Sequence, residues 1–223
     1  INTIRPSDTI YIAFDGVAPF AKMEQQRQRR YKSYYQSMVS ESILPKKTED
    51  PWNTISITPG TTFMRDLNQK TAKYYSNQHL KYNVKKIIVS GSNEPGEGEH
   101  KLFHYIRSSP QEHHGTKSIV YGLDADLIML SMNHLPYTSI YLYRETPQFI
   151  QSISKDLEPN ESYLMDIPLL SETLAREMNI PGEDSVVKDY ILLCFFLGND
   201  FMPHFPSFNI RTGGLDKLLN AYN

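Results

Sequence analysis

Three short apolar runs of this chain are each followed by acidic residues with a glycine close by. The runs are TIYIAFD at residues 9–15, KKIIVS at 85–90 and KSIVYGLD at 117–124. The carboxylates that end or follow them are Asp15, then Glu97 and Glu99, then Asp124 and Asp126. In an open α/β sheet the carboxyl ends of parallel strands lie at one edge, where functional crevices form. We therefore expect these acids to gather at that edge.

Helix-forming segments separate the apolar runs. Helices are expected over residues 21–44, 58–82, 98–109, 168–178 and 184–198, with a short one after Asp126, and further strands over 138–144 and 161–167. Pro45 is expected to end the first helix and Thr58 to cap the second, with a loop over 46–57. The 184–198 run is apolar nearly all round, which predicts burial. The alternation predicts an α/β fold with a mostly parallel central sheet flanked by helices, in one domain over residues 1–223.

The charge and composition give no sign of a membrane or of a strongly basic surface. The chain has 23 Lys and Arg against 25 Asp and Glu, so a nucleic-acid partner would need a local basic patch. Its longest apolar runs are far shorter than the ~20 residues that span a bilayer, and INTIRPSD lacks the features of a signal peptide. The one cysteine, Cys194, excludes an internal disulfide. We expect an intracellular protein, cytoplasmic or nuclear, with no membrane role.

Asp200, in the run FFLGNDFMPHFP, is a further candidate because it follows a predicted helix that the next prolines end. The candidate cluster then has six carboxylates. Unit charges about 4 Å apart repel by several kcal/mol at a protein-like dielectric, so such a cluster needs a cation. Oxygen ligands suit hard divalent ions, which predicts Mg²⁺ or Mn²⁺. Two such ions about 4 Å apart are a common arrangement for phosphodiester cleavage.

The segment PGEGEH indicates how two carboxylates would share one ion. In extended chain, residues two apart point the same way, and Gly98 permits a tight turn, so Glu97 and Glu99 are expected to face one site. Two structural alternatives stay open. A single acid after a strand is often a helix N-cap, and PGEGEH by itself is also typical of a solvated acidic loop. The metal hypothesis rests on the acids occurring together.

A basic face is expected on the helix that follows Asp15. At 100° per residue, Lys22, Gln26, Arg29 and Arg30 fall at about 0°, 40°, −20° and 80°, and therefore share one side. Arg27 falls near 140° and points away. Arg provides forked donors for phosphate oxygens, so this face suits a terminal phosphate. The alternative is an ordinary solvated basic face.

Four sequence blocks carry a resemblance to a known family. DGVAPFAKMEQQRQRR, SGSNEPGEGEHK, YGLDADLIML and GNDFMPHFPS occur in this order between residues 10 and 215. They resemble the signature blocks of the Xrn family of 5′-to-3′ exoribonucleases, relatives of flap endonucleases with a PIN-like nuclease core. The resemblance implies that Lys22, Gln26, Arg29 and Arg30 bind a 5′-phosphate. It places the family's catalytic and metal-binding acids at Asp15, Glu97, Glu99, Asp124, Asp126 and Asp200.

Parts of the family pattern have no counterpart in this chain. Family members carry a further catalytic Asp on an earlier strand, followed by a stacking residue, and a C-terminal region whose Trp stacks on the opposite side. Trp52 does not match that residue, and Phe20 stands where members usually have Arg. We therefore expect a nuclease-core fragment whose active site is completed by the missing segments or by a partner chain.

The resemblance implies hydrolysis of single-stranded RNA with a 5′-monophosphate, releasing nucleoside 5′-monophosphates, with Mg²⁺ or Mn²⁺ as cofactor and two ions expected. Two alternatives stay open. One is a catalytically impaired RNA-binding or scaffolding remnant of the same family, which the missing Asp would favour. The other is a haloacid-dehalogenase-type phosphohydrolase, but that class needs a second Asp two residues after the nucleophile, where this chain has Val17.

Overall fold

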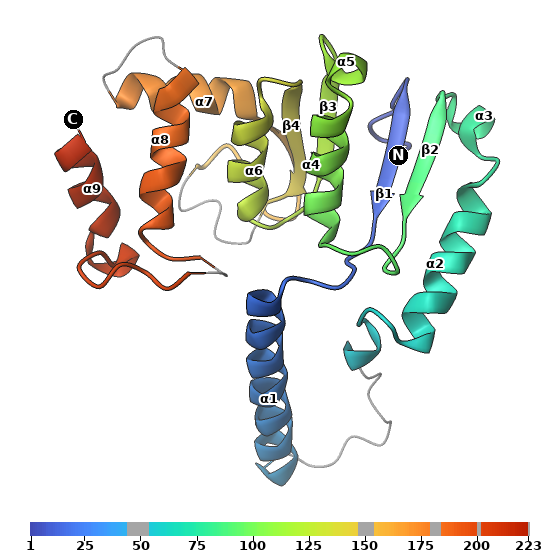
Figure 1. The fold of residues 1–223 in the computed structure, drawn as a ribbon, viewed down its shortest axis with the longest axis horizontal. Coiled ribbons are helices and arrows are strands. Elements are labelled where there is room, and N and C mark those ends of the chain that lie inside the picture. The colour runs from blue at the N-terminus through green and yellow to red at the C-terminus, as the bar shows by residue number, and fades with distance from the viewer. Residues whose placement is uncertain (44–53, 147–153, 179–183, 200–201, 223) are drawn as a thin grey trace. The chain divides into compact units, whose positions relative to one another are not determined.

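The computed structural model describes residues 1–43, 54–146, 154–178, 184–199 and 202–222 (Figure 1). The chain divides into two compact units, residues 1–102 and residues 103–223. Within the described ranges, no helix is both long enough and apolar enough to cross a bilayer. Pro45, Trp52 and Asp200 lie outside the described residues.

The first unit contains a pair of parallel strands, β1 (Thr9–Ala13) and β2 (Lys86–Ser90), in which Ile10 lies opposite Ile87. Between them along the chain come α1 (Phe20–Ile43), η1 (Thr54–Ser56), α2 (Thr62–Tyr75) and α3 (His79–Tyr82). Helix α2 packs beside β2, and Met64 of α2 is buried. The parallel pairing of β1 and β2 agrees with the predicted mostly parallel sheet.

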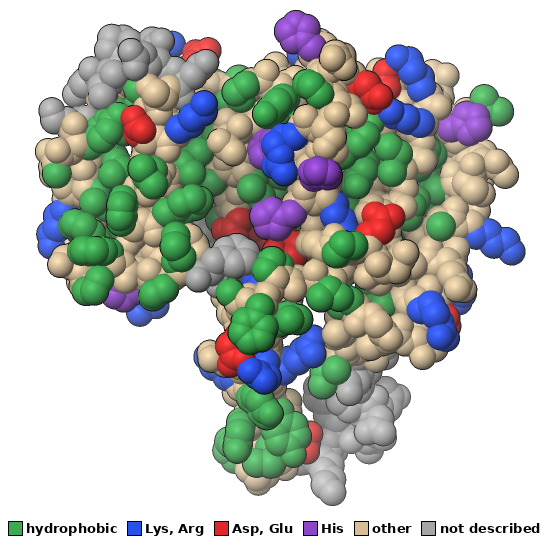
Figure 2. All heavy atoms as spheres, in the orientation of Figure 1, with side chains coloured by type: hydrophobic (Ala, Val, Ile, Leu, Met, Phe, Trp, Pro, Cys, Tyr) green, Lys and Arg blue, Asp and Glu red, His purple; other side chains and the backbone are tan. Residues whose placement is uncertain are grey.

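Helix α1 is 24 residues long, and none of its residues is buried. Its range agrees with the predicted helix over 21–44. Residues with high helix propensity, such as Ala21, Met23 and Gln25, dominate its first turns. This propensity explains why the helix forms although none of its residues is buried. Hydrophobic and basic side chains lie next to one another on its visible surface (Figure 2).

The predicted boundaries of the second helix are wrong at its start. Helix α2 begins at Thr62, and Thr61, not Thr58, is its N-cap, with its side-chain oxygen accepting from the Met64 amide at 3.3 Å. Gly60 has a φ of 91°, which directs the chain away from a helix just before that cap.

The same predicted helix is also interrupted before Tyr82. The observed helix α2 ends at Tyr75, and the short helix α3 begins at His79. In the segment between them, the Ser76 hydroxyl donates a hydrogen bond to the Lys73 carbonyl. Ser and Asn side chains compete for backbone bonds and favour turns over helix interiors, which explains the break at Ser76 and Asn77.

The second unit contains a three-stranded sheet in the order β3 (Lys117–Tyr121), β4 (Ser139–Glu145) and β5 (Ser162–Asp166). β3 and β4 are parallel, whereas β4 and β5 are antiparallel. Helices α6 (Asp126–His134) and α7 (Ile167–Glu177) pack on β4, and α8 (Asp184–Phe195) packs on both. Phe103, Ile140, Leu142 and Ile167 are fully buried and form the centre of this core.

The predicted α/β class with mostly parallel strands and flanking helices is confirmed. The described strands form two sheets, one in each unit, instead of a single central sheet. Helix α4 (Gly98–Ser108) starts in the first unit and continues into the second. Four short elements of the described residues were not predicted: η1 in the expected loop, α5 (Pro110–His113), η3 (Ile210–Thr212) and α9 (Gly214–Tyr222).

The expected burial of the 184–198 helix is wrong. Val186 is buried, but Leu192 and Phe195 are about half exposed, at 54% and 45%. A helix that is apolar on all sides is buried only where other helices or strands pack against it, and its own sequence does not specify those elements. In the described structure α8 packs on α6, α7 and α9, which leaves the side with Leu192 uncovered.

His134 at the end of α6 is fully buried and held by two polar contacts. Its Nδ1 lies 2.6 Å from the Leu130 carbonyl oxygen, and its Nε2 lies 2.8 Å from Nη1 of Arg107. A carbonyl only accepts and a guanidinium only donates, so these contacts need a neutral ring with its proton on Nδ1. Burial lowers the pKa of His134 below its ordinary value of 6.5; the Arg107 charge acts in the same direction and the bond to Leu130 opposes it.

We expect protonation of His134 to destabilise the protein. A histidine whose pKa is lower in the folded state gives stability that is present above the unfolded-state pKa and lost as the pH falls below it. The unfolding free energy should therefore fall between about pH 7.5 and pH 5, and His134→Gln should show a smaller fall. Urea unfolding at both pH values measures this. His104→Gln, at an exposed histidine of α4, should keep the wild-type pH dependence; an equal fall in His134→Gln would contradict the assignment.

Candidate metal and phosphate site

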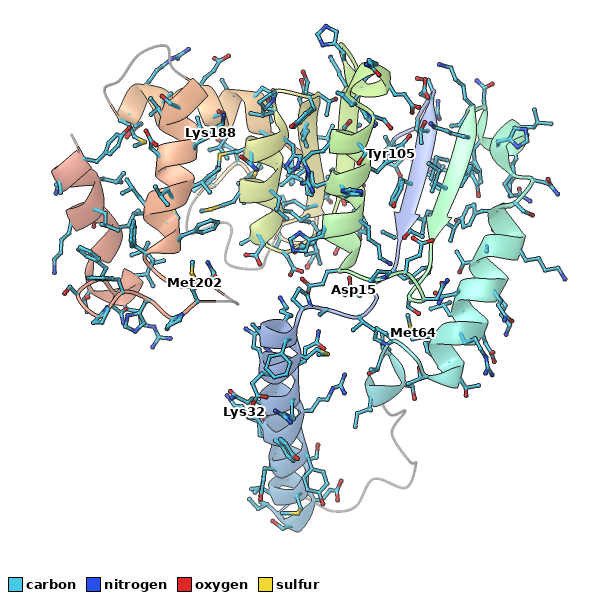
Figure 3. The ribbon with its side chains drawn as sticks, in the orientation of Figure 1. Asp15, Lys32, Met64, Tyr105, Lys188 and Met202 are labelled. Carbon is cyan, nitrogen blue, oxygen red and sulfur yellow. The ribbon has the colours of Figure 1, made fainter. Side chains whose placement is uncertain are left out.

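Asp15 lies just beyond the end of β1, where Figure 3 labels it. Its Oδ1 accepts a hydrogen bond from the Gly98 amide at 2.6 Å. Gly98 is the first residue of α4, and the first amides of a helix have no partner within the helix. Asp15 therefore caps α4 as well as standing at the strand end. One carboxylate oxygen is used by this cap, and the other is left for a ligand.

The loops after β1 and β2 are bonded to each other through their backbones. The Gly16 amide donates to the Gly96 carbonyl at 2.8 Å, and the Gly96 amide donates to the Val17 carbonyl at 3.0 Å. A Cβ added at Gly16 would lie 1.8 Å from the Glu94 carbonyl oxygen, so only glycine allows this approach. The two loops are thereby fixed relative to each other, which holds Asp15 beside the start of α4.

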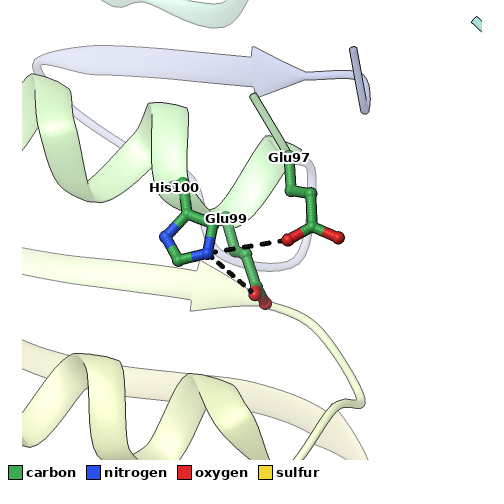
Figure 4. A group of neighbouring side chains, drawn as sticks. All are labelled: Glu97, Glu99 and His100. Atoms are coloured by element: carbon green, nitrogen blue, oxygen red, sulfur yellow. Dashed lines mark ion pairs between the residues drawn. The ribbon is translucent and has the colours of Figure 1, made fainter. Parts of the chain in front are cut away.

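Glu97, Glu99 and His100 form a cluster in the first unit (Figure 4). One potential ligand atom from each lies within 4.8 Å of the others. His100 Nε2 is 3.6 Å from Glu97 Oε2 and 3.9 Å from Glu99 Oε1. Glu97 is buried, and its Oε2 has no hydrogen-bond donor. A buried carboxylate oxygen without a donor is costly unless a cation satisfies it.

The two glutamates meet by a different geometry from the one predicted. Glu97 precedes α4 and Glu99 lies in its first turn, so the segment is not extended. The tight turn comes from Gly96, which has a φ of 96°, whereas Gly98 has no positive φ. A Cβ at Gly98 would lie 3.2 Å from both the Ala13 carbonyl and Asp15 Oδ1, so the role of Gly98 is close backbone approach.

The residues of the predicted basic face lie on α1, and the first of them, Lys22, contacts the acidic cluster. Lys22 Nζ is 3.5 Å from Glu97 Oε1, and the two side chains are 14% and 9% exposed. Gln26 is half-buried, while Arg29 and Arg30 are exposed. Arg30 donates to the Thr58 hydroxyl at 3.1 Å. Arg27, which was predicted to point away from this face, pairs with Glu24 on α1.

The donors of this cluster fit a hard divalent cation. Carboxylate oxygens are the preferred ligands of Mg²⁺ and Mn²⁺, and imidazole is tolerated by Mn²⁺. His100 was missed by sequence reasoning, which treated the cluster as purely carboxylate. Its position next to Glu99 in GEGEH is the signal that could have included it. The buried Glu97 Oε2, which has no hydrogen-bond donor, is the observation that favours an ion here over a solvated acidic loop.

The remaining predicted acids belong to the second unit or lie outside the described residues. Asp124 is exposed in the loop after β3, and Asp126 is exposed at the start of α6, both in the second unit. Asp200 lies outside the described residues. Their membership of one six-acid site stays a prediction.

Lys101 is a further residue that sequence reasoning missed. It is buried, and its ammonium donates to the Phe14 carbonyl at 2.9 Å and to the Gly91 carbonyl at 2.7 Å. These carbonyls lie just beyond the ends of β1 and β2. Burial lowers the pKa of Lys101, and the charges of Glu94 and Asp15 oppose that shift. Lysine is rarely buried, so nothing in its sequence position indicated this role.

Comparison with known proteins places the chain in a family. Residues 1–146 match the family described as XRN 5'-3' exonuclease N-terminus, and residues 182–223 match the Xrn1 helical domain. The chain is 36% identical to 5'-3' exoribonuclease 1 of Saccharomyces cerevisiae over 99% of its length. It is 34% identical to 5'-3' exoribonuclease 2 of Arabidopsis thaliana over 98% of its length. The chain therefore belongs to the Xrn family, which confirms the resemblance carried by the four sequence blocks.

The chain spans only part of these relatives. It covers 16% of the Saccharomyces cerevisiae protein and 27% of the Arabidopsis thaliana protein. A third relative, 5'-3' exoribonuclease 1 of Schizosaccharomyces pombe, is 37% identical and is covered over 18% of its length.

We expect Lys101→Met to destabilise the first unit. The substitution removes the ammonium that donates to the Phe14 carbonyl and leaves the Gly91 carbonyl with the Glu94 amide at 3.1 Å alone. A buried polar group without a partner costs about 1–3 kcal/mol. The unfolding free energy should fall by about 2 kcal/mol or more. Urea unfolding followed by circular dichroism measures the change. Lys70→Met, at an exposed lysine of α2, is the matched control and should shift it by less than about 0.5 kcal/mol. Equal effects of the two substitutions would remove the role of Lys101.

Proposed function

We propose that this protein is a metal-dependent 5′-to-3′ exoribonuclease. The observation that carries the proposal is the ion pair between Glu97 and Lys22 at the start of the basic face. Glu97 is buried, and its Oε2 has no hydrogen-bond donor. A cation site and a phosphate-binding face then adjoin each other, as cleavage next to a terminal phosphate requires. The named relatives are 5'-3' exoribonucleases, which supports the same activity for this chain.

We propose Mg²⁺ or Mn²⁺ as the cofactor, held first by Glu97 and Glu99, with His100 beside them and the free oxygen of Asp15 within the same unit. When bound, such an ion supplies activation of water and stabilisation of the leaving oxygen in phosphodiester hydrolysis. Asp124, Asp126 and Asp200 are proposed to hold a second ion. That assignment requires residues 1–223 to act as one nuclease core.

The basic face of α1 is proposed to bind the 5′-phosphate of single-stranded RNA. Lys22 and Arg29 supply charge, Gln26 supplies an amide, and Arg30 is fixed by its bond to Thr58. A 5′-monophosphate would be held by forked and ammonium donors. A capped or triphosphorylated end would be refused because of its size and charge.

The proposed reaction releases one nucleoside 5′-monophosphate at a time, in an intracellular compartment where 5′-monophosphorylated RNA is available. The basic face orients the first phosphodiester bond against the acids. Asp15, tied to α4 through the Gly98 amide, keeps its carboxylate fixed relative to Glu99 in the first turn of that helix. Fixed geometry of this kind lowers the barrier to hydrolysis, because the reacting groups lose less orientational freedom on reaching the transition state.

Activity on different RNA 5′-ends tests the proposal. RNAs with a 5′-hydroxyl, a 5′-monophosphate or a 5′-triphosphate are incubated with the full-length protein and Mg²⁺, and the products are resolved by chromatography. We expect release of nucleoside 5′-monophosphates from the monophosphorylated RNA above the other two. Glu99→Gln should reduce this rate by roughly 100-fold or more because it removes a carboxylate ligand. Equal turnover of all three ends, or undiminished activity of Glu99→Gln, would contradict the proposal.

The phosphate-binding face is tested by a pair of arginines on the same helix. Arg29→Ala should lower the ratio of kcat/KM for 5′-monophosphate RNA over 5′-hydroxyl RNA by about 10- to 100-fold, the worth of one charged hydrogen bond. Arg27→Ala removes the same charge from the other side of α1, where Arg27 pairs with Glu24, and should leave the ratio unchanged. A similar change in both variants would indicate a general charge effect and not a phosphate site.

A further inference from the structure

Lys22 has two roles that compete for one ammonium group. In the structure it pairs with Glu97, at 3.5 Å and with both side chains largely buried. In the proposed function the same ammonium binds the 5′-phosphate of RNA. An ion pair that is shielded from water is stronger than one at the surface, so giving it up has a real cost.

Glu97 is poorly satisfied without Lys22. Its Oε2 already lacks a hydrogen-bond donor, and within the described residues its other cationic neighbour is His100 at 3.6 Å, a group that is charged only when protonated. Moving the Lys22 ammonium to a phosphate would leave a buried carboxylate with little compensation, which is strongly unfavourable.

A divalent cation on Glu97 removes this cost. It would neutralise the carboxylate that holds Lys22, and its own positive charge would repel the ammonium. A shift of Lys22 toward an anion would then have no cost for Glu97. The binding of the cation and the binding of a 5′-phosphate are therefore linked through one residue.

We propose that Glu97 is a specificity-determining residue: it restrains Lys22 in the metal-free protein, so that preference for a 5′-phosphate develops only when a divalent cation occupies the carboxylate cluster. This inference rests on the proposed function. Linkage is reciprocal, so a 5′-phosphate increases the affinity for the cation by the same factor. The consequence is that the protein does not hold 5′-monophosphorylated ends selectively before it is able to cleave them.

The test measures binding, not turnover. Fluorescence anisotropy gives the Kd of one short single-stranded RNA with a 5′-monophosphate or a 5′-hydroxyl, in EDTA and in Ca²⁺, and a gel confirms that the RNA stays intact. The preference is the ratio of the two Kd values. For the wild-type full-length protein we expect Ca²⁺ to increase this ratio by a factor in the range of about 5 to 150, the usual size of coupling between two sites.

The variants separate the linkage from a simple attraction between phosphate and Ca²⁺. Glu97→Gln should show a higher ratio than wild type already in EDTA, with little further effect of Ca²⁺, because the carboxylate that pairs with Lys22 is removed. Lys22→Met should show a low ratio in both conditions. Glu94→Gln, which removes an equal charge from the same loop, should behave as wild type, since Glu94 bonds to Ser90 and not to Lys22.

A second measurement needs no RNA. Isothermal titration with Ca²⁺ should give a lower Kd for Lys22→Met than for wild type, because the competing ammonium is gone. This keeps the inference testable if circular dichroism shows that Glu97→Gln does not fold.

The outcomes distinguish the inference from the proposed function. A wild-type ratio that is above one and equal in EDTA and Ca²⁺ would overturn the linkage while leaving the phosphate site intact. A Glu97→Gln ratio in EDTA equal to the wild-type ratio would likewise overturn the linkage and leave the phosphate site intact. A ratio of one in every protein and condition would overturn the phosphate site itself. Unchanged Ca²⁺ affinity in Lys22→Met would overturn the competition.

Discussion

The hydrogen bond from the Gly98 amide to Asp15 is the interaction on which the candidate site depends. It joins the end of β1 to the first residue of α4, two segments 83 positions apart in the chain. The buried ammonium of Lys101 supports it by bonding to carbonyls that follow β1 and β2. A short helix with acids in and before its first turn is thereby held at the ends of two parallel strands. These bonds fix where Glu97 and Glu99 lie relative to Asp15.

Positive charge is distributed around the acids of the first unit in a way that the acids alone do not reveal. Lys22 pairs with Glu97, the charges of Asp15 and Glu94 act on Lys101, and His100 lies beside both glutamates. Protein cations thus partly balance the carboxylates in the first unit, yet Glu97 Oε2 still lacks a donor. Negative charge is therefore left uncompensated at Glu97, and a site for a divalent cation requires such uncompensated negative charge.

The sequence predicted the long or strongly patterned elements well and the boundaries between weaker ones poorly. Helix α1 and the strands β1, β2 and β3 follow from composition and apolar runs. The start of α2 was misplaced because Thr58 and Thr61 are both acceptable caps, and only the positive φ of Gly60 decides between them. The burial of α8 was overestimated because an apolar helix does not specify which neighbours cover it. For the site, the sequence predicted which side of α1 carries Lys22, but it did not predict the ion pair of Lys22 with Glu97.

The sequence by itself determined the chemistry that is available: acids next to glycines after strands, a basic helix face, and four blocks that place the chain in the Xrn family. Such information is local, because residue type, spacing and order do not depend on the rest of the fold. Only the tertiary structure decided that Gly96 makes the turn, that Asp15 caps α4, and that Lys101 is buried between two backbone carbonyls. Each of these depends on segments distant in sequence meeting within hydrogen-bond distance, and no local pattern encodes which partner a carboxylate or an ammonium will find.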